Sequence, residues 1–316
     1  MGSKKIAIDI MVIILAILLF IIWHQNFIVD KARTTFSNVE FYNIYLITTD
    51  KEYEYWYQLN QGAEDMANLM GVNYIWDAPD ERNVYKQIEV INRAVERGAY
   101  ALLVAADDPK FISGVVEDAK ARGVRVIYVD SPAFEEAITT LATDNYQAGV
   151  IAGQTMISSL DRSGYDSGSI GIVSYSDKAN TELREMGFRD ALARDTRYKV
   201  LETIYTLRGD IEESQMVAEQ LMNENEDLIA LFGTNEGTSE GVGNAIKAKD
   251  NQYIGVGFDS TEAMRKLLNE GSLKAIIVQN PYTMGYLGMA QAVAAILGKD
   301  TGPEYIDTGV SVISSE

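Results

Sequence analysis

Residues 101–130 read ALLVAADDPKFISGVVEDAKARGVRVIYVD. Two short apolar runs within them, Ala101–Ala105 and Val124–Asp130, are typical of strands buried on both faces. Between these runs, Ile112–Ala121 carries apolar residues at helical spacing, and Gly123 follows where a left-handed residue commonly ends a helix. The pattern therefore predicts a complete β-α-β unit.

The same alternation continues on both sides of this unit. Further strands are predicted at Asn43–Thr49, Val72–Asp77, Leu141–Thr143, Ser169–Tyr175, Val200–Tyr205, Leu228–Gly233, Tyr253–Asp259 and Ala275–Gln279. Helical spacing recurs between them, as in Val84–Arg97 and Ser214–Met222, and Gly71 and Gly98 fall just past helices. Strict alternation indicates parallel sheets covered by helices, and this many strands favour two doubly wound lobes over one sheet.

The N-terminal segment has the features of a membrane anchor. Lys4 and Lys5 precede Ile6–Trp23, which is apolar apart from Asp9, and no small-residue cleavage site follows it. A spanning helix needs about 20 apolar residues, so the length of this run is borderline. We expect residues 6–23 to be a retained transmembrane anchor, with 1–5 as a cytoplasmic tip and 24–40 as an extracellular linker. A cleaved signal peptide is the alternative.

Composition excludes several classes of function. Of the 316 residues, 47% are apolar and 23% charged, which suits folded lobes, and the net charge of −19 disfavours nucleic acid as a partner. The chain has no cysteine, which removes disulfides, thiolate catalysis and the lipid-modified cysteine of many surface proteins. The single histidine, His24, precedes the lobes, so they can hold neither a Ser-His-Asp triad nor a histidine metal site. We expect no cofactor and no metal.

The ends of the predicted strands carry the candidate site. Ligands of open parallel sheets bind beyond the carboxyl ends of the strands, where the connecting loops meet. The side chains found there are Tyr53, Tyr55, Trp56, Asp130, Asn235, Asp259 and Gln279, with Arg184 a few residues past another strand. Aromatic faces suit the C–H face of a sugar, and carboxylate, amide and guanidinium groups suit its hydroxyls.

Each of these residues also has a purely structural interpretation. Asp130, Asn235 and Asp259 could cap helices, and Gln279 could belong to a turn. Arg184 could pair with Glu185 or Asp190 on a solvated face, and Tyr55 and Trp56 could be packing residues. The convergence of these residues on strand-end loops favours the ligand site.

Ordered motifs over about 270 residues carry a family resemblance. They are Tyr55-Trp56 with Leu59 and Gly62, Val126–Asp130, Ala142–Asn145 with Gly149, Arg184 with Gly187-Phe188, Phe232–Asn235, Val256–Asp259 and Ile277–Gln279. From about Tyr42 onward the chain resembles the periplasmic binding proteins of the ribose/xylose/galactose type, which share their fold with the ligand domains of lactose-repressor-like regulators.

The resemblance implies roles for the candidate residues. Tyr55 and Trp56 would stack on a sugar, and Asp130, Arg184, Asn235, Asp259 and Gln279 would hydrogen-bond its hydroxyls. Crossings near Thr143–Asp144, Gln279–Asn280 and Thr308–Gly309 would form a three-stranded hinge. The lobes would then comprise residues 41–143 plus 280–308 and residues 144–279 plus 309–316.

The chain also departs from the ribose-binding pattern. Ser131 stands where ribose binders have arginine, Gly209 where they have an aromatic residue, and Tyr53 where they have asparagine. These departures leave a pentose or hexose pyranose open. Membrane-anchored, xylose-sensing members resemble this chain in layout, so D-xylose is the expected ligand and a sensor histidine kinase the expected partner. The alternative is the solute-binding component of a sugar ABC transporter.

Three other classes of protein are alternatives to a binding protein: a hydrolase, a transcription regulator and an adhesive domain. Gly237–Gly241 matches the G-x-S-x-G string of hydrolases around Ser239, but the lobes lack a histidine base. A transcription regulator needs a basic helix-turn-helix where this chain has its apolar segment. An adhesive domain would bind no small ligand and show no closure of the lobes. We therefore expect a binding protein and not an enzyme.

Overall fold

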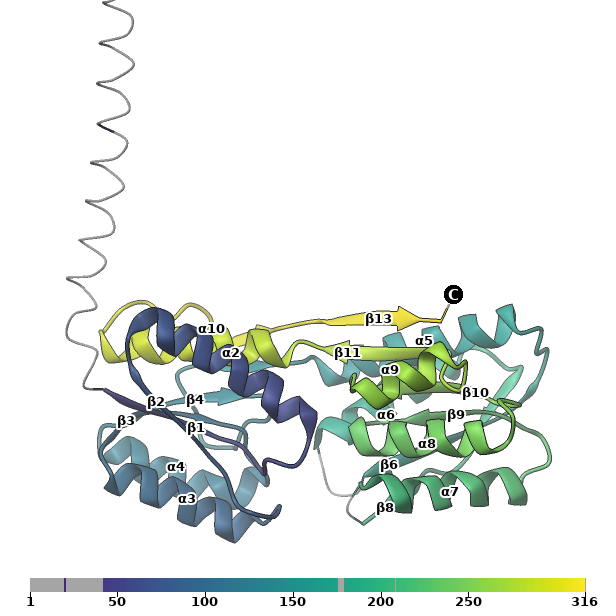
Figure 1. Ribbon diagram of the computed structural model, residues 1–316, viewed down its shortest axis with the longest axis horizontal. Helices are drawn as coiled ribbons and strands as arrows, with labels where there is room; N and C mark the ends of the chain where they lie inside the picture. Colours follow the sequence, from purple (N-terminus) through teal and green to yellow (C-terminus); the bar gives the residue numbers. More distant parts are fainter. Residues whose placement is uncertain (1–19, 21–41, 176–178, 208, 316) are drawn as a thin grey trace, which may run out of the picture.

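Figure 1 shows the computed structural model of the chain, which describes residues 20, 42–175, 179–207 and 209–315. The predicted tip, anchor and linker at residues 1–40 lie outside the described residues, apart from Phe20. Within the described part, no helix has both the length and the apolar character that crossing a bilayer requires.

The first lobe is built on a six-stranded parallel sheet with the order β12-β5-β4-β3-β1-β2. Its strands are β1 (Asn43–Ile47), β2 (Asn73–Asp77), β3 (Ala99–Val104), β4 (Arg125–Val129), β5 (Thr140–Ala142) and β12 (Tyr305–Asp307). One face packs against α2 (Glu54–Met70) and α10 (Pro281–Ile296), and the other against α3 (Val84–Glu96) and α4 (Pro109–Ala121) (Figure 1). Buried aliphatic side chains on both faces hold these layers together.

The second lobe repeats this arrangement. Its sheet has the order β13-β11-β10-β9-β6-β7, with β8 also paired to β6, and only β13 runs antiparallel to its neighbour. The strands are β6 (Gly168–Tyr175), β7 (Tyr198–Val200), β8 (Ile204–Thr206), β9 (Leu228–Gly233), β10 (Ile254–Phe258), β11 (Ala275–Gln279) and β13 (Val310–Ser314). Helices α5 (Asn145–Arg162) and α6 (Ala179–Leu192) cover one face, and α7 (Ile211–Glu224), α8 (Glu236–Ala248) and α9 (Glu262–Asn269) the other.

The predicted alternation and the two parallel-sheet lobes are confirmed. Gly71, Gly98 and Gly123 end helices with φ of +70°, +79° and +86°, values that glycine adopts at little cost. The predicted strand at 200–205 is instead two short strands, β7 and β8, both beside β6. Strands β12 and β13 were not predicted, because both are short and largely exposed and so lack a strand-like apolar run.

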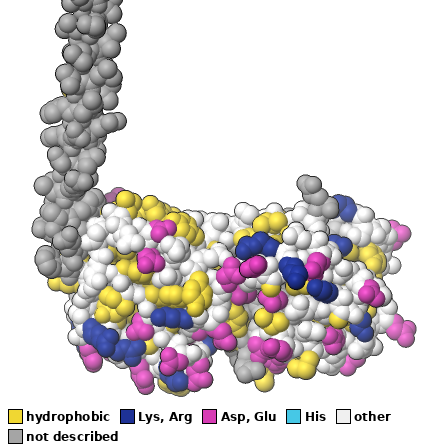
Figure 2. Space-filling model, in the orientation of Figure 1, with side chains coloured by type: hydrophobic (Ala, Val, Ile, Leu, Met, Phe, Trp, Pro, Cys, Tyr) yellow, Lys and Arg dark blue, Asp and Glu magenta, His cyan; other side chains and the backbone are white. Residues whose placement is uncertain are grey.

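The chain passes between the lobes at three adjacent places: from β5 to α5, from β11 to α10 and from β12 to β13. Side chains tie these passages together. Asn280 Nδ2 donates to the carbonyl oxygens of Thr308 (2.7 Å) and Gly309 (3.2 Å), and Thr143 Oγ1 donates to Gln279 Oε1 at 2.8 Å. Acidic side chains are scattered over both lobes on the face that Figure 2 shows, in keeping with the net charge of −19.

Candidate functional site

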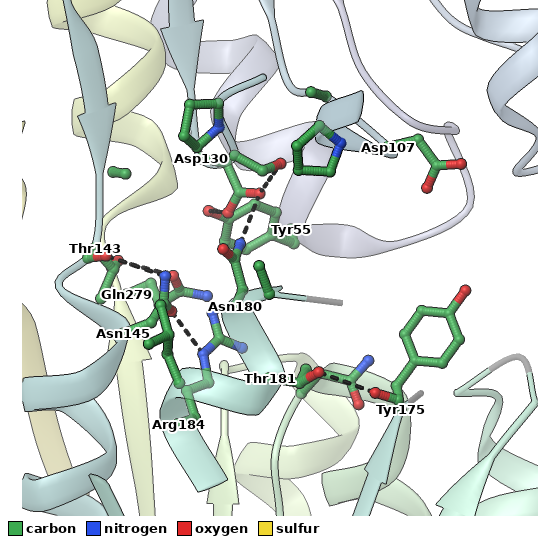
Figure 3. A pocket seen from close by; sticks show the side chains of 18 of the residues that line it. Tyr55, Asp107, Asp130, Thr143, Asn145, Tyr175, Asn180, Thr181, Arg184 and Gln279 are labelled. Atoms are coloured by element: carbon green, nitrogen blue, oxygen red, sulfur yellow. Dashed lines mark hydrogen bonds between the residues drawn. The ribbon is translucent and has the colours of Figure 1, made fainter. Parts of the chain in front are cut away.

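A cavity of about 540 Å³ lies between the lobes, at the carboxyl ends of strands from both sheets (Figure 3). The structure brings all the predicted site residues to its wall: Tyr53, Tyr55, Trp56, Asp130, Arg184, Asn235, Asp259 and Gln279. The volume is in the range of small-molecule sites, and polar groups from both lobes face it.

Asp130 follows β4 and presents its carboxylate to the cavity. Its φ of 65° is left-handed, a conformation that aspartate tolerates better than most residues and that often marks functional positions. Oδ1 accepts a hydrogen bond from the Tyr55 hydroxyl at 2.7 Å. Oδ2 accepts from the Ser131 hydroxyl (2.9 Å) and from Asn180 Nδ2 (3.3 Å), and Asn180 belongs to the opposite lobe. No described helix begins at Asp130, so its interpretation as a helix cap is wrong.

The first turn of α2 supplies the aromatic wall. Burial, with the nearby Asp130 carboxylate, raises the pKa of the Tyr55 phenol well above its usual value, so the hydroxyl stays a donor. The Trp56 ring meets Tyr55 edge-on, with ring centroids 5.0 Å apart. Trp56 is only 5% exposed and belongs to the core of the first lobe as well as to the cavity wall.

Trp56→Ala is therefore expected to lower the free energy of unfolding by about 3–5 kcal/mol, the usual cost of truncating a large buried ring. Urea denaturation of the full chain measures this change. Tyr57→Ala is the control, because the neighbouring Tyr57 is 53% exposed, and it should cost less than about 1 kcal/mol. Equal effects of the two substitutions would contradict the placement of Trp56 in the core.

Arg184 reaches the cavity from α6 in the second lobe. The side chain is only 3% exposed. Its Nε donates to Asn145 Oδ1 at 2.8 Å, and its Nη1 donates to the Thr234 carbonyl oxygen at 2.9 Å. The guanidinium lies 3.8 Å from the centre of the Phe258 ring. Burial lowers its pKa, and the nearby carboxylates of Asp259 and Asp130 oppose that shift. The alternative of a surface ion pair is wrong.

Small residues explain how Arg184 reaches this position. A Cβ atom on Gly149 of α5 would lie 2.1 Å from the Arg184 carbonyl oxygen, and one on Gly187 of α6 would lie 2.1 Å from the Tyr146 carbonyl oxygen. Only glycine allows the two helix backbones to approach this closely. Gly149 and Gly187, both part of the motifs that carry the family resemblance, therefore help to set the position of the guanidinium.

Asp259 and Gln279 form a linked pair at the ends of β10 and β11. Asp259 has a φ of 77°, and its Oδ1 accepts a hydrogen bond from Gln279 Nε2 at 2.7 Å. Burial raises the pKa of Asp259, while Arg184 and the Gln279 hydrogen bond act in the opposite direction. Thr261, and not Asp259, caps α9, so the capping interpretation of Asp259 is wrong. Through Thr143, Gln279 also joins this pair to the passages between the lobes.

Asn235 and Tyr53, the two remaining predicted residues, line the cavity at the start of helices. Asn235 does cap α8, because its Oδ1 accepts from the Thr238 backbone N–H at 3.2 Å, yet it also lines the cavity. Tyr53 precedes α2 and gives it no side-chain cap. Burial, helped by the charges of Asp50 and Glu52, raises the pKa of Tyr53 to about 12.

Several cavity residues were missed. Asn145 holds Arg184, and Asn180 reaches across to Asp130. Arg82 Nε contacts Asp107 Oδ1 at 2.7 Å, and the guanidinium lies 5.3 Å from the centre of the Tyr175 ring, in the other lobe. Asp107 and Tyr175 lie at or just past strand ends, so the rule that found the other residues could have found them.

Tyr175 lies beside Gly209, the position at which the ribose-binding pattern has an aromatic residue. A Cβ atom on Gly209 would lie 3.1 Å from Tyr175 Cγ, so the Tyr175 side chain occupies the space beside this glycine. The end of β6 thus supplies an aromatic side chain to the cavity wall next to Gly209.

Ser239 has a structural role. Its buried hydroxyl donates to the Gly233 carbonyl oxygen at 3.0 Å and accepts the Phe258 backbone N–H at 2.7 Å, which ties α8 to β9 and β10. The described residues contain no cluster of histidine, cysteine, aspartate and glutamate able to hold a metal ion. The cavity thus offers carboxylate, guanidinium, amide and phenol groups that can bind a polar ligand.

The sequence profile of the periplasmic binding protein domain matches residues 44–300. The chain belongs to the periplasmic binding protein family. The match includes both sheets apart from the start of β1 and the final strands β12 and β13, and it includes every predicted site residue.

Individual members of the family are similar over most of the chain. The D-ribose/D-allose-binding protein of Pseudomonas aeruginosa is 26% identical, covering 73% of this chain and 73% of its own. The ribose import binding protein of Bacillus subtilis is 27% identical, and the match covers 76% of this chain and 77% of that protein. A solute-binding protein of an ABC transporter from Burkholderia graminis, solved with D-arabinose, superposes with a TM-score of 0.82 at 26% identity, covering 88% of this chain and 96% of that one.

Proposed function

We propose that this periplasmic binding protein binds one sugar molecule between its lobes. The observation that carries the proposal is the convergence of two carboxylates, Asp130 and Asp259, and one guanidinium, Arg184, on a cavity between the lobes. Paired sugar hydroxyls can donate to the carboxylates and accept from the guanidinium, and such charge-assisted hydrogen bonds are the stronger kind. The names of the relatives, which refer to ribose, allose and arabinose, support a sugar of this size.

The expected ligand is a pentose such as D-xylose. Ser131 and Gly209 remove two large side chains of the ribose-binding pattern, and Tyr53 and Tyr175 add phenol groups to the wall. A changed set of wall groups favours a sugar whose hydroxyls differ in arrangement from those of ribose. All contacts proposed here hold and orient a ligand, so we propose a binding role and no catalysis.

Sugar binding would favour the closed arrangement of the lobes. We propose that the three adjacent passages between the lobes act as the hinge and that a membrane partner binds the closed form better than the open one. The names of the relatives favour the permease of a sugar ABC transporter. The sensor histidine kinase that the sequence analysis expected, with residues 6–23 as the anchor that holds the lobes outside the membrane, becomes the alternative proposal.

Isothermal titration calorimetry tests the proposal. The full chain is titrated with D-xylose, D-ribose, L-arabinose, D-glucose and D-galactose, and with an amino acid as an unrelated polar control. We expect micromolar binding of one sugar at a stoichiometry of one. If none of the sugars binds, the sugar assignment is wrong, while the fold and the family stand.

A further inference from the structure

Glu236, which the site analysis had missed, joins the two lobes. It is the first residue of α8 in the second lobe, and its carboxylate reaches the first turn of α2 in the first lobe. Oε1 accepts the Glu54 backbone N–H at 3.3 Å, and Oε2 accepts the Tyr55 backbone N–H at 3.2 Å.

The contact satisfies a need of α2 that its own chain leaves open. The first N–H groups of a helix have no partner within the helix, and a capping side chain usually accepts one of them. Tyr53, at the capping position, provides no such side chain. The Trp56 N–H bonds to the Tyr53 carbonyl oxygen at 3.2 Å, which leaves the Glu54 and Tyr55 N–H groups for Glu236.

A second contact runs in the opposite direction. Glu54 belongs to the first lobe, and its Oε2 accepts the backbone N–H of Glu262, the first residue of α9 in the second lobe, at 3.3 Å. Its Oε1 also lies 3.6 Å from Arg265 Nη2 of the same helix. Each lobe thus presents a glutamate carboxyl group to backbone N–H groups at the start of a helix in the other.

We propose that Glu236 is a positioning residue, which caps α2 only when the lobes are closed and thereby holds the Tyr55–Trp56 wall against the second lobe. Opening the lobes would expose the two N–H groups and the carboxylate to water. The contact therefore links the order of the first turn of α2 to closure. The proposal adds to the proposed function, because α2 carries the aromatic wall of the same cavity, but its test needs no sugar.

Protonation of Glu236 makes the contact sensitive to pH. Burial, together with the charge of Asp259, raises the pKa of Glu236 to about 8; the charge of Glu54 adds to this rise, and the N–H groups of Tyr55 and Glu54 oppose it. Glu240 lies one turn further along α8, and Arg265 of α9 faces Glu54. In the open form Glu236 should titrate near its ordinary pKa of about 4.3, so closure takes up a proton between the two values. Closure is then most favoured at low pH, weakens as the pH rises from about 4.3 to about 8, and changes little above that.

Hydrogen–deuterium exchange of the ligand-free full chain tests the proposal directly. In Glu236→Ala, the amides of Glu54 and Tyr55 should exchange about 10-fold faster, since two hydrogen bonds of modest strength are lost. Glu236→Gln keeps one acceptor oxygen, so it should have a smaller effect and should lose most of the pH dependence between about pH 5 and pH 8. Glu240→Ala is the matched control on the same helix, because Glu240 contacts Thr261 within its own lobe, and it should leave the exchange of both amides unchanged.

A second pair of variants separates the backbone contact from the Glu54 side chain. Proline is well tolerated at the first position of a helix and lacks the N–H, and Tyr53 before it already has an extended backbone. Glu54→Pro should therefore open the lobes more than Glu54→Ala does, seen as a larger radius of gyration in small-angle X-ray scattering. The further opening from Glu54→Ala to Glu54→Pro reports the backbone N–H alone, and it should be smaller when Glu236 is replaced by Ala than when Glu236 is present. Wild-type amide exchange in Glu236→Ala, or a further opening of the same size with and without Glu236, would overturn the proposal, whether or not any sugar binds.

Discussion

Asp259→Asn should weaken sugar binding at least about 100-fold, because a carboxylate that accepts two hydroxyl hydrogen bonds is worth roughly 3 kcal/mol or more over an amide. Asp259 is buried in the cavity wall beside Arg184 and Gln279. The protein should remain folded, since asparagine also tolerates a φ of 77° and burial already disfavours the charge. Titration calorimetry gives the affinity, and thermal unfolding checks the fold.

Asp250→Asn provides the matched control for this prediction. Asp250 is also an aspartate with a left-handed backbone (φ 54°), but it is exposed and does not line the cavity. Its substitution should leave the affinity unchanged. If Asp259→Asn bound the sugar as tightly as Asp250→Asn does, the proposed site would be wrong.

Arg184→Lys should weaken binding by about 30-fold or more, which corresponds to roughly 2 kcal/mol. Lysine keeps the positive charge but cannot hold Asn145 and the Thr234 carbonyl while stacking on Phe258 as the guanidinium does. The ammonium would therefore sit differently between the two carboxylates. Calorimetry with the same sugar measures the loss.

Arg189→Lys is the control, one turn further along α6. Arg189 pairs with Glu185 and bonds to Leu201 and Thr203 within the second lobe, away from the cavity. We expect wild-type affinity from this variant. Equal losses in both variants would point to a general effect of weakening α6 and would contradict a direct role of Arg184.

The parts of the fold that could be predicted are those whose strands and helices leave a local apolar pattern in the sequence. The run at residues 101–130 predicts its two strands and the helix between them within a few residues, because burial on both faces leaves a continuous apolar run. β13 gives no such signal, since most of its side chains are exposed and its place comes from pairing with β11. The break between β7 and β8 likewise depends on pairing with β6 and not on composition.

The cavity could be predicted where residues end strands, because parallel strands bring their carboxyl ends to one edge. Asp130, Asp259 and Gln279 were found in this way. Glu236 and Asn180 were not predicted, because each forms hydrogen bonds with the opposite lobe. The sequence does not indicate how the two lobes are oriented relative to one another. The left-handed backbone of Asp130 and Asp259 was also hidden, since aspartate is common in both capping and strained positions.

The central claim is that one sugar is held by both lobes at once. Hydrogen–deuterium exchange of the full chain, with and without a saturating amount of the sugar that calorimetry selects, tests it most directly. We predict that the sugar slows exchange in segments of both lobes together: those around Tyr55 and Asp130 in the first, and those around Arg184, Asn235 and Asp259 in the second. Slower exchange in only one lobe, or at a surface outside the cavity, would contradict a ligand site between the lobes.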